Sequence, residues 1–146
     1  MVFFDWRKNC TVTAVSVQKK IIIAEDDQTE QTFIREGFKK SGLFDVMSIQ
    51  PDGHKLVKML EKLDESSLPD VILSDINMPL MNGLEALVKI KKNPKLADIP
   101  FIIFSTSKES ATETRCYTLG ADKFMVKPAN FNDYKNFAMQ VNQAIT

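Results

Sequence analysis

Carboxylates, hydroxyls and one ammonium group stand at four places in this chain, each directly after a short apolar run. In chain order they are Glu25, Asp26 and Asp27, then Ser74 and Asp75, then Ser105, Thr106 and Ser107, and finally Lys127. If the runs are parallel strands of one sheet, all of these groups lie at the same edge of it. Carboxylates crowded together repel one another, and a divalent cation removes that cost. The pattern therefore predicts an acidic, cation-binding edge.

The ligand types favour magnesium and phosphoryl chemistry. Mg²⁺ prefers oxygen ligands in octahedral geometry, usually one or two carboxylates together with waters and phosphate oxygens. An aspartate, which is ionised at neutral pH, attacks phosphorus without a general base and forms an aspartyl phosphate. Catalysis then consists of positioning and of neutralising charge on the transferred oxygens, which a metal ion, a hydroxyl and a lysine supply. Asp75 is the best-placed nucleophile in the set.

The elements that must position these groups alternate along the chain. From Lys20 onward, short apolar runs are followed by longer amphipathic stretches. The runs predict strands at 21–25, 44–49, 70–74, 100–105 and 122–126, and the stretches predict helices at 28–42, 52–65, 84–92, 110–120 and 131–145. This alternation predicts the α/β class, with a five-stranded parallel sheet, helices on both faces and right-handed crossovers.

Length and composition narrow the class of protein. The chain has 146 residues, of which 44% are hydrophobic and 26% are charged, as expected for one globular domain. Basic and acidic side chains both number 19, so the net charge is zero and gives no support to direct nucleic-acid binding. No apolar stretch approaches the roughly 18 to 20 residues that span a bilayer, and the amino-terminal segment lacks a signal-peptide core. We therefore predict a cytoplasmic protein that does not enter membranes.

Two features leave alternatives open. Residues 1–19 fall outside the alternation and are interpreted as an extension to a domain at 20–146. A disordered or loosely attached leader is favoured for this extension, ahead of an added edge strand or a misassigned start site. Cys10 and Cys116 lie far apart without metal-ligand spacing, and two reduced thiols are favoured over a disulfide.

Four segments carry a resemblance when they are taken together and in order. They are IIIAEDD at 21–27, DVILSDINMPLMNG at 70–83, IPFIIFSTS at 99–107 and GADKFMVKP at 120–128. Each segment is a weak signal alone, but together they make the region from about Lys20 to Thr146 resemble the receiver domain of two-component response regulators. The single-domain, chemotaxis-regulator-like kind is the best match. The resemblance implies a flavodoxin-like, doubly wound (βα)5 fold.

The resemblance also implies roles for the acidic residues. Asp75 is implied to be the phosphoacceptor. Glu25 and Asp26 are implied to hold Mg²⁺ together with Asp75, and Asn77 to add its backbone carbonyl. Asp27 falls one position past the acidic pair, so it is interpreted as the N-cap of the following helix.

Further roles fall to the later segments. Ser105 is implied to be the switch hydroxyl that bonds the phosphoryl oxygen, and Lys127 to contact the phosphoryl group directly. Phe124 matches the switch aromatic, although many members of the family have tyrosine there and Phe124 lacks that hydroxyl. Asn77 and Ser107 match positions that tune phosphoryl hydrolysis. The family also implies a cis peptide bond between Lys127 and the proline that follows it.

The main hypothesis is a single-domain response regulator. It would take a phosphoryl group from a sensor histidine kinase or a histidine phosphotransfer protein, dephosphorylate itself slowly at most, and signal to a protein target. The family further implies a homodimer through the 111–127 face. One alternative is a phosphohydrolase of the haloacid dehalogenase type, which wants a second aspartate where this chain has Asn77. The other is a receiver-fold binding module that works without phosphorylation.

Overall fold

Five parallel strands form the central sheet of the protein. The computed structural model describes residues 4–5, 10–11 and 17–146. The strands of the sheet are β3 (Lys19–Ala24), β4 (Phe44–Gln50), β5 (Val71–Asp75), β6 (Phe101–Ser105) and β7 (Lys123–Val126). Their order across the sheet is β4-β3-β5-β6-β7, and every neighbouring pair is parallel. The predicted five-stranded parallel sheet is confirmed.

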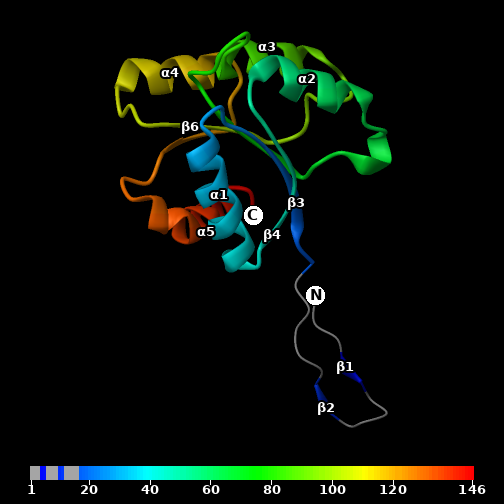
Figure 1. Cartoon of the computed structure of the whole chain (residues 1–146). Helices are drawn as coiled ribbons and strands as arrows, with labels where there is room; N and C mark the ends of the chain where they lie inside the picture. The colour runs from blue at the N-terminus through cyan, green and yellow to red at the C-terminus, as the bar shows by residue number, and fades with distance from the viewer. Residues whose placement is uncertain (1–3, 6–9, 12–16) are drawn as a thin grey trace.

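Helices cover both faces of this sheet, as predicted. They are α1 (Gln28–Ser41), α2 (Gly53–Lys62), α3 (Gly83–Lys92), α4 (Ser110–Thr118) and α5 (Tyr134–Ala144), with short 3-10 helices at Glu65–Ser67 and Phe131–Asp133. Helices α1 and α5 lie together on one side of the sheet, and α2, α3 and α4 lie on the other (Figure 1). The sheet is therefore the middle of three layers.

The strands bury side chains on both faces, which explains why their sequences are continuously apolar. Ile21 and Ile23 of β3 belong to the core shared with α1 and α5, whereas Ile22 and Ala24 belong to the core shared with α2 and α3. Successive strand residues point to opposite faces of a sheet, so a strand with helices on both sides needs apolar residues at every position. Full burial of each isoleucine contributes about 1.5–3 kcal/mol.

Capping residues determine where α1 and α3 begin, close to the carboxyl ends of β3 and β5. The Asp27 side chain accepts a hydrogen bond from the backbone N–H of Glu30 at 2.9 Å, which confirms the predicted N-cap of α1. Helix α3 begins with a capping box between Asn82 and Glu85. Helix α1 ends at Ser41 with Gly42 as its C-cap, also as predicted.

The strand order reverses between β3 and β5. The chain passes from β3 outward to β4, and then returns to β5 on the other side of β3. In open α/β sheets, this reversal creates a crevice beyond the carboxyl ends of the two strands. Ala24 is paired with Ser74 across the two strands, so Glu25 and Asp75, the next residues, emerge side by side at that crevice.

Gly83 fixes the distance between α3 and the end of β5. A Cβ atom at Gly83 would overlap the carbonyl oxygen of Asp75, and the Gly83 N–H donates to the carbonyl of Ile76 at 2.8 Å. We expect Gly83→Ala to lower the free energy of unfolding by about 3 kcal/mol, because the backbone of α3 must move away from β5. Urea denaturation measures the change, with Lys92→Ala at the exposed end of α3 as the control. Equal stability of both variants would contradict this close approach.

The amino-terminal part is described only in two short pieces. Strands β1 (Phe4–Asp5) and β2 (Cys10–Thr11) pair with each other in antiparallel orientation. The predicted leader at 1–19 falls mainly on residues outside the described part, and it stays a prediction; Lys19 already belongs to β3. Within the described residues, no helix combines the length and apolar character that a membrane crossing requires.

Candidate functional site

Three acidic side chains meet in the crevice between β3 and β5. Glu25 and Asp26 follow β3, and Asp75 is the last residue of β5. One carboxylate oxygen from each lies within 4.8 Å of the others. Glu25 and Asp75 are buried, whereas Asp26 is exposed. The predicted acidic set is therefore brought together, with its open side toward solvent at Asp26.

The Asp75 carboxylate is oriented by two hydrogen bonds. Its Oδ1 atom accepts from the backbone N–H of Ile76 at 2.7 Å, and its Oδ2 atom accepts from Lys127 Nζ at 3.0 Å. The buried Ser74 hydroxyl donates to the carbonyl of Asp75 at 2.8 Å, which fixes the backbone beside it. These contacts hold the carboxylate still while leaving it at the edge of the sheet.

Lys127 is the only basic side chain that bonds this acidic set in the described part of the chain. Its Nζ atom lies 2.7 Å from Glu25, 3.0 Å from Asp75 and 3.1 Å from Glu30. The side chain is only 8% exposed, and its ammonium group lies 4.9 Å from the centroid of the Phe104 ring. Lys127 follows β7 directly, and its N–H donates to the Ser105 carbonyl at 2.8 Å, so strand pairing carries the lysine to the crevice.

The other residues predicted for the site differ in how deeply they are buried. Ser105 is buried at the end of β6, and its hydroxyl accepts from the Ser107 N–H at 3.2 Å. Phe124 is buried in the core below, and its N–H donates to the Tyr117 hydroxyl at 3.1 Å. Asn77 lies exposed in the loop after β5. The peptide bond after Lys127 is trans, so the expectation of a cis bond there was wrong.

Comparison with known proteins identifies the family to which this arrangement belongs. The model of the response regulator receiver domain matches residues 21–138, which include all four segments of the crevice. The chain is a receiver domain of the response regulator family. Response regulator Rcp1 from Synechocystis sp. is 30% identical over 118 residues, which cover 79% of this chain and 80% of the relative.

Solved structures of receiver domains have the same fold. The phosphorylated cyanobacterial phytochrome response regulator RcpA superposes with a TM-score of 0.76 at 29% identity, over 87% of this chain and 93% of that one. The Mn²⁺-bound form of response regulator Rcp1 superposes with a TM-score of 0.70 at 27% identity, over 86% of this chain and 92% of that one. The flavodoxin-like doubly wound fold is confirmed.

Membership decides the class of function. Receiver domains are phosphoacceptors in two-component signalling rather than enzymes in the usual sense, and histidine kinases or phosphotransfer proteins phosphorylate them. The phosphoacceptor signalling role predicted from the sequence is therefore confirmed. The two alternatives, a haloacid dehalogenase-type hydrolase and a module independent of phosphorylation, are not favoured by these matches.

Burial and neighbouring charges change the acidity of this receiver's crevice. Burial, together with the Glu30 and Asp75 carboxylates, raises the pKa of Glu25 to about 9, although Lys127 opposes the shift. Burial favours neutral Lys127, but its contacts with Glu25 and Asp75 prevail and raise the pKa of the ammonium group. Burial also opposes ionisation of Glu30, yet its contacts with Glu25, Tyr134 and Lys127 lower its pKa. Without a metal ion, the crevice therefore raises the pKa values of both Glu25 and Lys127.

The metal-free receiver is expected to lose stability as the pH rises from about 4.5 toward about 9, the ordinary and the folded-state pKa of Glu25. Below this window both states hold the Glu25 proton, so its stabilising contribution is complete. Within the window the unfolded chain releases the proton while the folded protein keeps it, and stability falls with pH. Urea denaturation in a chelator at several pH values measures the slope.

Two comparisons check the assignment of that slope to Glu25. The variant Glu25→Gln lacks the titrating group, so its stability should depend less on pH across the same window. A divalent cation in the acidic set would favour the ionised form of Glu25, so any stabilisation by saturating Mg²⁺ should be greater near about pH 8 than near about pH 6. A slope that survives the substitution unchanged would assign the effect to another group.

Two residues of the crevice were missed by the sequence reasoning. Glu30 of α1 and Tyr134 of α5 do not follow a strand, yet the Glu30 carboxylate contacts Lys127, and the Tyr134 hydroxyl donates to Glu30. The available signal for Glu30 was its place three residues after the N-cap Asp27, which ordinarily indicates a capping box. Nothing in the sequence near Tyr134 connects it with residues about a hundred positions earlier.

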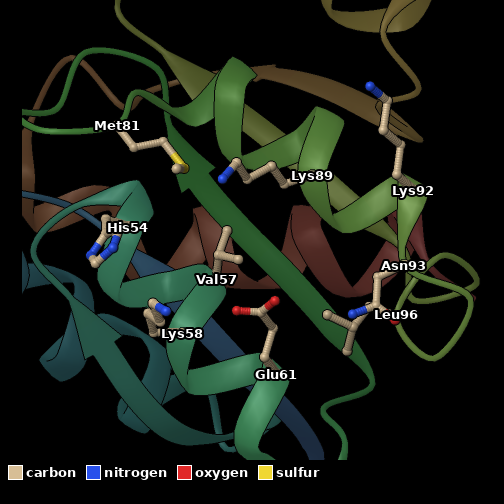
Figure 2. A pocket seen from close by; sticks show the side chains of 9 residues that line it. All are labelled: His54, Val57, Lys58, Glu61, Met81, Lys89, Lys92, Asn93 and Leu96. Atoms are coloured by element: carbon tan, nitrogen blue, oxygen red, sulfur yellow. The ribbon is translucent and has the colours of Figure 1, made fainter.

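A groove lies elsewhere, between α2 and α3, and has a volume of about 540 Å³. Figure 2 shows its lining, which α2, α3 and the loops on either side of α3 contribute. Val57 and Leu96 give the groove an apolar part, and the charged side chains of Lys58, Lys89 and Glu61 also line it. None of the residues of the acidic crevice lines this groove. The chemistry of the receiver is therefore separate from this hollow.

Proposed function

We propose that Asp75 accepts the phosphoryl group in this receiver domain. The single observation that supports this assignment is the position of its carboxylate, which bonds Lys127 at 3.0 Å and stands within 4.8 Å of carboxylate oxygens of Glu25 and Asp26. An Asp75 oxygen forms a bond to phosphorus while the bond from phosphorus to the donor nitrogen breaks. The donor imidazole keeps the electron pair of that bond, and the product is an aspartyl phosphate.

The donor set of the crevice fits Mg²⁺. Glu25, Asp26 and Asp75 supply hard carboxylate oxygens, and the backbone carbonyl of Asn77 is the remaining candidate ligand. Bound Mg²⁺ would supply positive charge that lowers repulsion among the carboxylates and the phosphoryl oxygens. The Mn²⁺-bound form of the relative Rcp1 supports a divalent cation as the ligand class.

The other predicted residues have separate tasks in this proposal. Lys127 neutralises the phosphoryl oxygens, and Ser105 donates its hydroxyl to one of them. Phe124 changes its packing when Ser105 moves, since it is buried one strand away from it. Asn77 and Ser107, two residues past Asp75 and Ser105, set how fast water hydrolyses the aspartyl phosphate. Hydrolysis of the aspartyl phosphate is then slow and is the only turnover of the protein.

The partners in this proposal are proteins. A sensor histidine kinase or a histidine phosphotransfer protein donates the phosphoryl group in the cytoplasm, and a protein target reads the phosphorylated form. Dimerisation through α4 and β7 is supported by Tyr117 and Val126, whose side chains are 40% and 37% exposed on that face. No direct contact with nucleic acid is included.

Phosphorylation by a small donor tests the proposal without a cognate kinase. The protein is incubated with Mg²⁺ and phosphoramidate, and intact mass reports an adduct of one phosphoryl group that resists acid and is lost in base. The adduct should form and then decay slowly after the donor is removed. Rapid hydrolysis of many phosphomonoesters would instead indicate a hydrolase, and a chain that forms no adduct with any donor would be a module independent of phosphorylation.

A further inference from the structure

Lys127 has a third carboxylate partner that no strand end supplies. Glu30 lies in the first turn of α1, and its carboxylate is within 3.1 Å of Lys127 Nζ. The side chain of Glu30 is 13% exposed, so this contact is largely removed from water. Glu85 has the same place in α3, three residues after the N-cap, and its carboxylate accepts a hydrogen bond from the backbone N–H of that N-cap residue in a capping box. Glu30 instead directs its carboxylate across the crevice to Lys127.

Tyr134 of the neighbouring helix α5 holds Glu30 in that orientation. Its hydroxyl donates to the Glu30 carboxylate, and the residue itself is 1% exposed. Its ring packs edge-on against Phe137, with centroids 5.7 Å apart. Gly37 of α1 lies so close that a Cβ atom there would come within 2.5 Å of Tyr134 Cβ. The tyrosine is therefore fixed by packing between α1 and α5, and its hydroxyl has little freedom to follow another partner.

The bonding capacity of Lys127 is filled before any phosphoryl group arrives. An ammonium group has three N–H donors, and Lys127 uses them on Glu25, Asp75 and Glu30. A phosphoryl group on Asp75 brings further anionic oxygens to the same place, so contact with them requires the lysine to release one carboxylate. Asp75 carries the phosphoryl group, and Glu25 belongs to the acidic set that fits the metal. Glu30 is the remaining partner, and it keeps its bond from Tyr134 after release.

We propose that Glu30, held by Tyr134, is a positioning residue that retains Lys127 in the unphosphorylated protein and competes with the phosphoryl group for its ammonium. This inference rests on the proposed function of Asp75. Transfer of Lys127 from Glu30 to the phosphoryl oxygen changes the bonding of Tyr134, and so connects the crevice with the α1–α5 side of the domain. The Glu30–Tyr134 pair thereby sets how readily the phosphorylated form is reached.

Binding of beryllofluoride, which imitates a phosphoryl group on aspartate, tests the competition at equilibrium. In saturating Mg²⁺, Glu30→Gln should bind beryllofluoride about tenfold more tightly than the wild type, because one charge-assisted bond no longer opposes the transfer of Lys127. Tyr134→Phe should instead bind beryllofluoride about threefold more weakly, because the Tyr134 hydroxyl stabilises the Glu30 carboxylate that Lys127 releases. Glu36→Gln, on an exposed position of the same helix, is the matched control and should leave the affinity unchanged.

A spectroscopic measurement distinguishes positioning from a merely structural role. The chain has two tyrosines, so labelling of tyrosine Cζ with carbon-13 gives two signals, which Tyr134→Phe assigns. In the wild type, beryllofluoride should shift the Tyr134 signal, because a Glu30 carboxylate released by Lys127 accepts more strongly from the hydroxyl. In Glu30→Gln this response should be lost while the melting temperature stays close to that of the wild type.

The outcomes separate this inference from the proposed function. If wild-type protein binds beryllofluoride but Glu30→Gln binds it equally or more weakly, the competition is overturned. If the wild-type Tyr134 signal does not respond to beryllofluoride, the connection through Tyr134 is overturned as well, whether or not the variants fold. If the wild type binds no beryllofluoride, or Asp75→Asn binds it equally well, the phosphoacceptor assignment itself fails.

Discussion

Asp75→Asn is expected to lower the yield of the phosphoryl adduct by at least about 100-fold, to the level of unincubated protein. The amide lacks the anionic oxygen that attacks phosphorus, although its size and its place at the end of β5 are nearly unchanged. The amide oxygen can still accept a hydrogen bond from Lys127, so the fold around the crevice should persist. Intact mass after incubation with Mg²⁺ and phosphoramidate measures the effect.

The control for this result is Asp27, the carboxylate that follows Glu25 and Asp26 in the chain. Asp27 caps α1 and accepts from the Glu30 N–H, but it is exposed and stands outside the acidic set within 4.8 Å. Asp27→Asn keeps the capping oxygen and should form the adduct as the wild type does. An adduct that survives in Asp75→Asn with equal yield would locate the phosphoryl group on another residue. Peptide mapping after borohydride reduction would then identify that residue.

Lys127→Met is expected to lower the free energy of unfolding of the metal-free protein by about 3 kcal/mol at neutral pH. The substitution keeps a linear side chain but removes the only cation bonded to Glu25, Glu30 and Asp75 in the described part of the chain. The Glu30 and Asp75 side chains are largely buried, so water screens the repulsion between their carboxylates weakly once the lysine is removed. Urea denaturation measures the loss, and the same variant should accept a phosphoryl group from phosphoramidate far more slowly than the wild type.

Mg²⁺ and a second lysine provide the controls for this prediction. Because a divalent cation supplies positive charge to the same carboxylates, saturating Mg²⁺ should restore part of the stability lost in Lys127→Met. Lys123→Met removes an exposed lysine from the other end of β7 and should change stability by less than about 0.5 kcal/mol. Equal losses in the two variants would mean that the charge of Lys127 contributes no more to stability than the charge of an exposed lysine.

The pH dependence, the Gly83 substitution and the Glu30 variants all test the close packing of charged groups around Asp75. Burial among carboxylates raises the pKa of Glu25, Gly83 allows α3 to approach the backbone of Asp75, and Glu30 occupies one donor of Lys127. Each property arises from the close packing of loops around the crevice. Together they describe a site in which acidic side chains outnumber the single lysine before any metal ion or phosphoryl group is added.

The sequence by itself determined the layered fold and the acidic edge. Ile21 to Ala24 and Val71 to Ser74 are continuous apolar runs, and a strand buried on both faces produces that pattern through local alternation of its side chains. Once the runs are parallel, their carboxyl ends must share one edge, so the meeting of Glu25, Asp75 and Lys127 follows from topology. The N-cap at Asp27 was likewise readable, because capping depends on residues only three positions apart.

Only the tertiary structure decided how the charges in the crevice are paired. The Lys127–Glu25 and Tyr134–Glu30 contacts join residues 102 and 104 positions apart. Tyr134 reaches Glu30 because Gly37 lets α1 and α5 approach closely. The trans peptide bond after Lys127, which the family resemblance did not lead us to expect, also came from the structure alone. Backbone periodicity is a local property that sequence records. The direction of a long side chain depends on which distant helix packs beside it, and no local pattern records that.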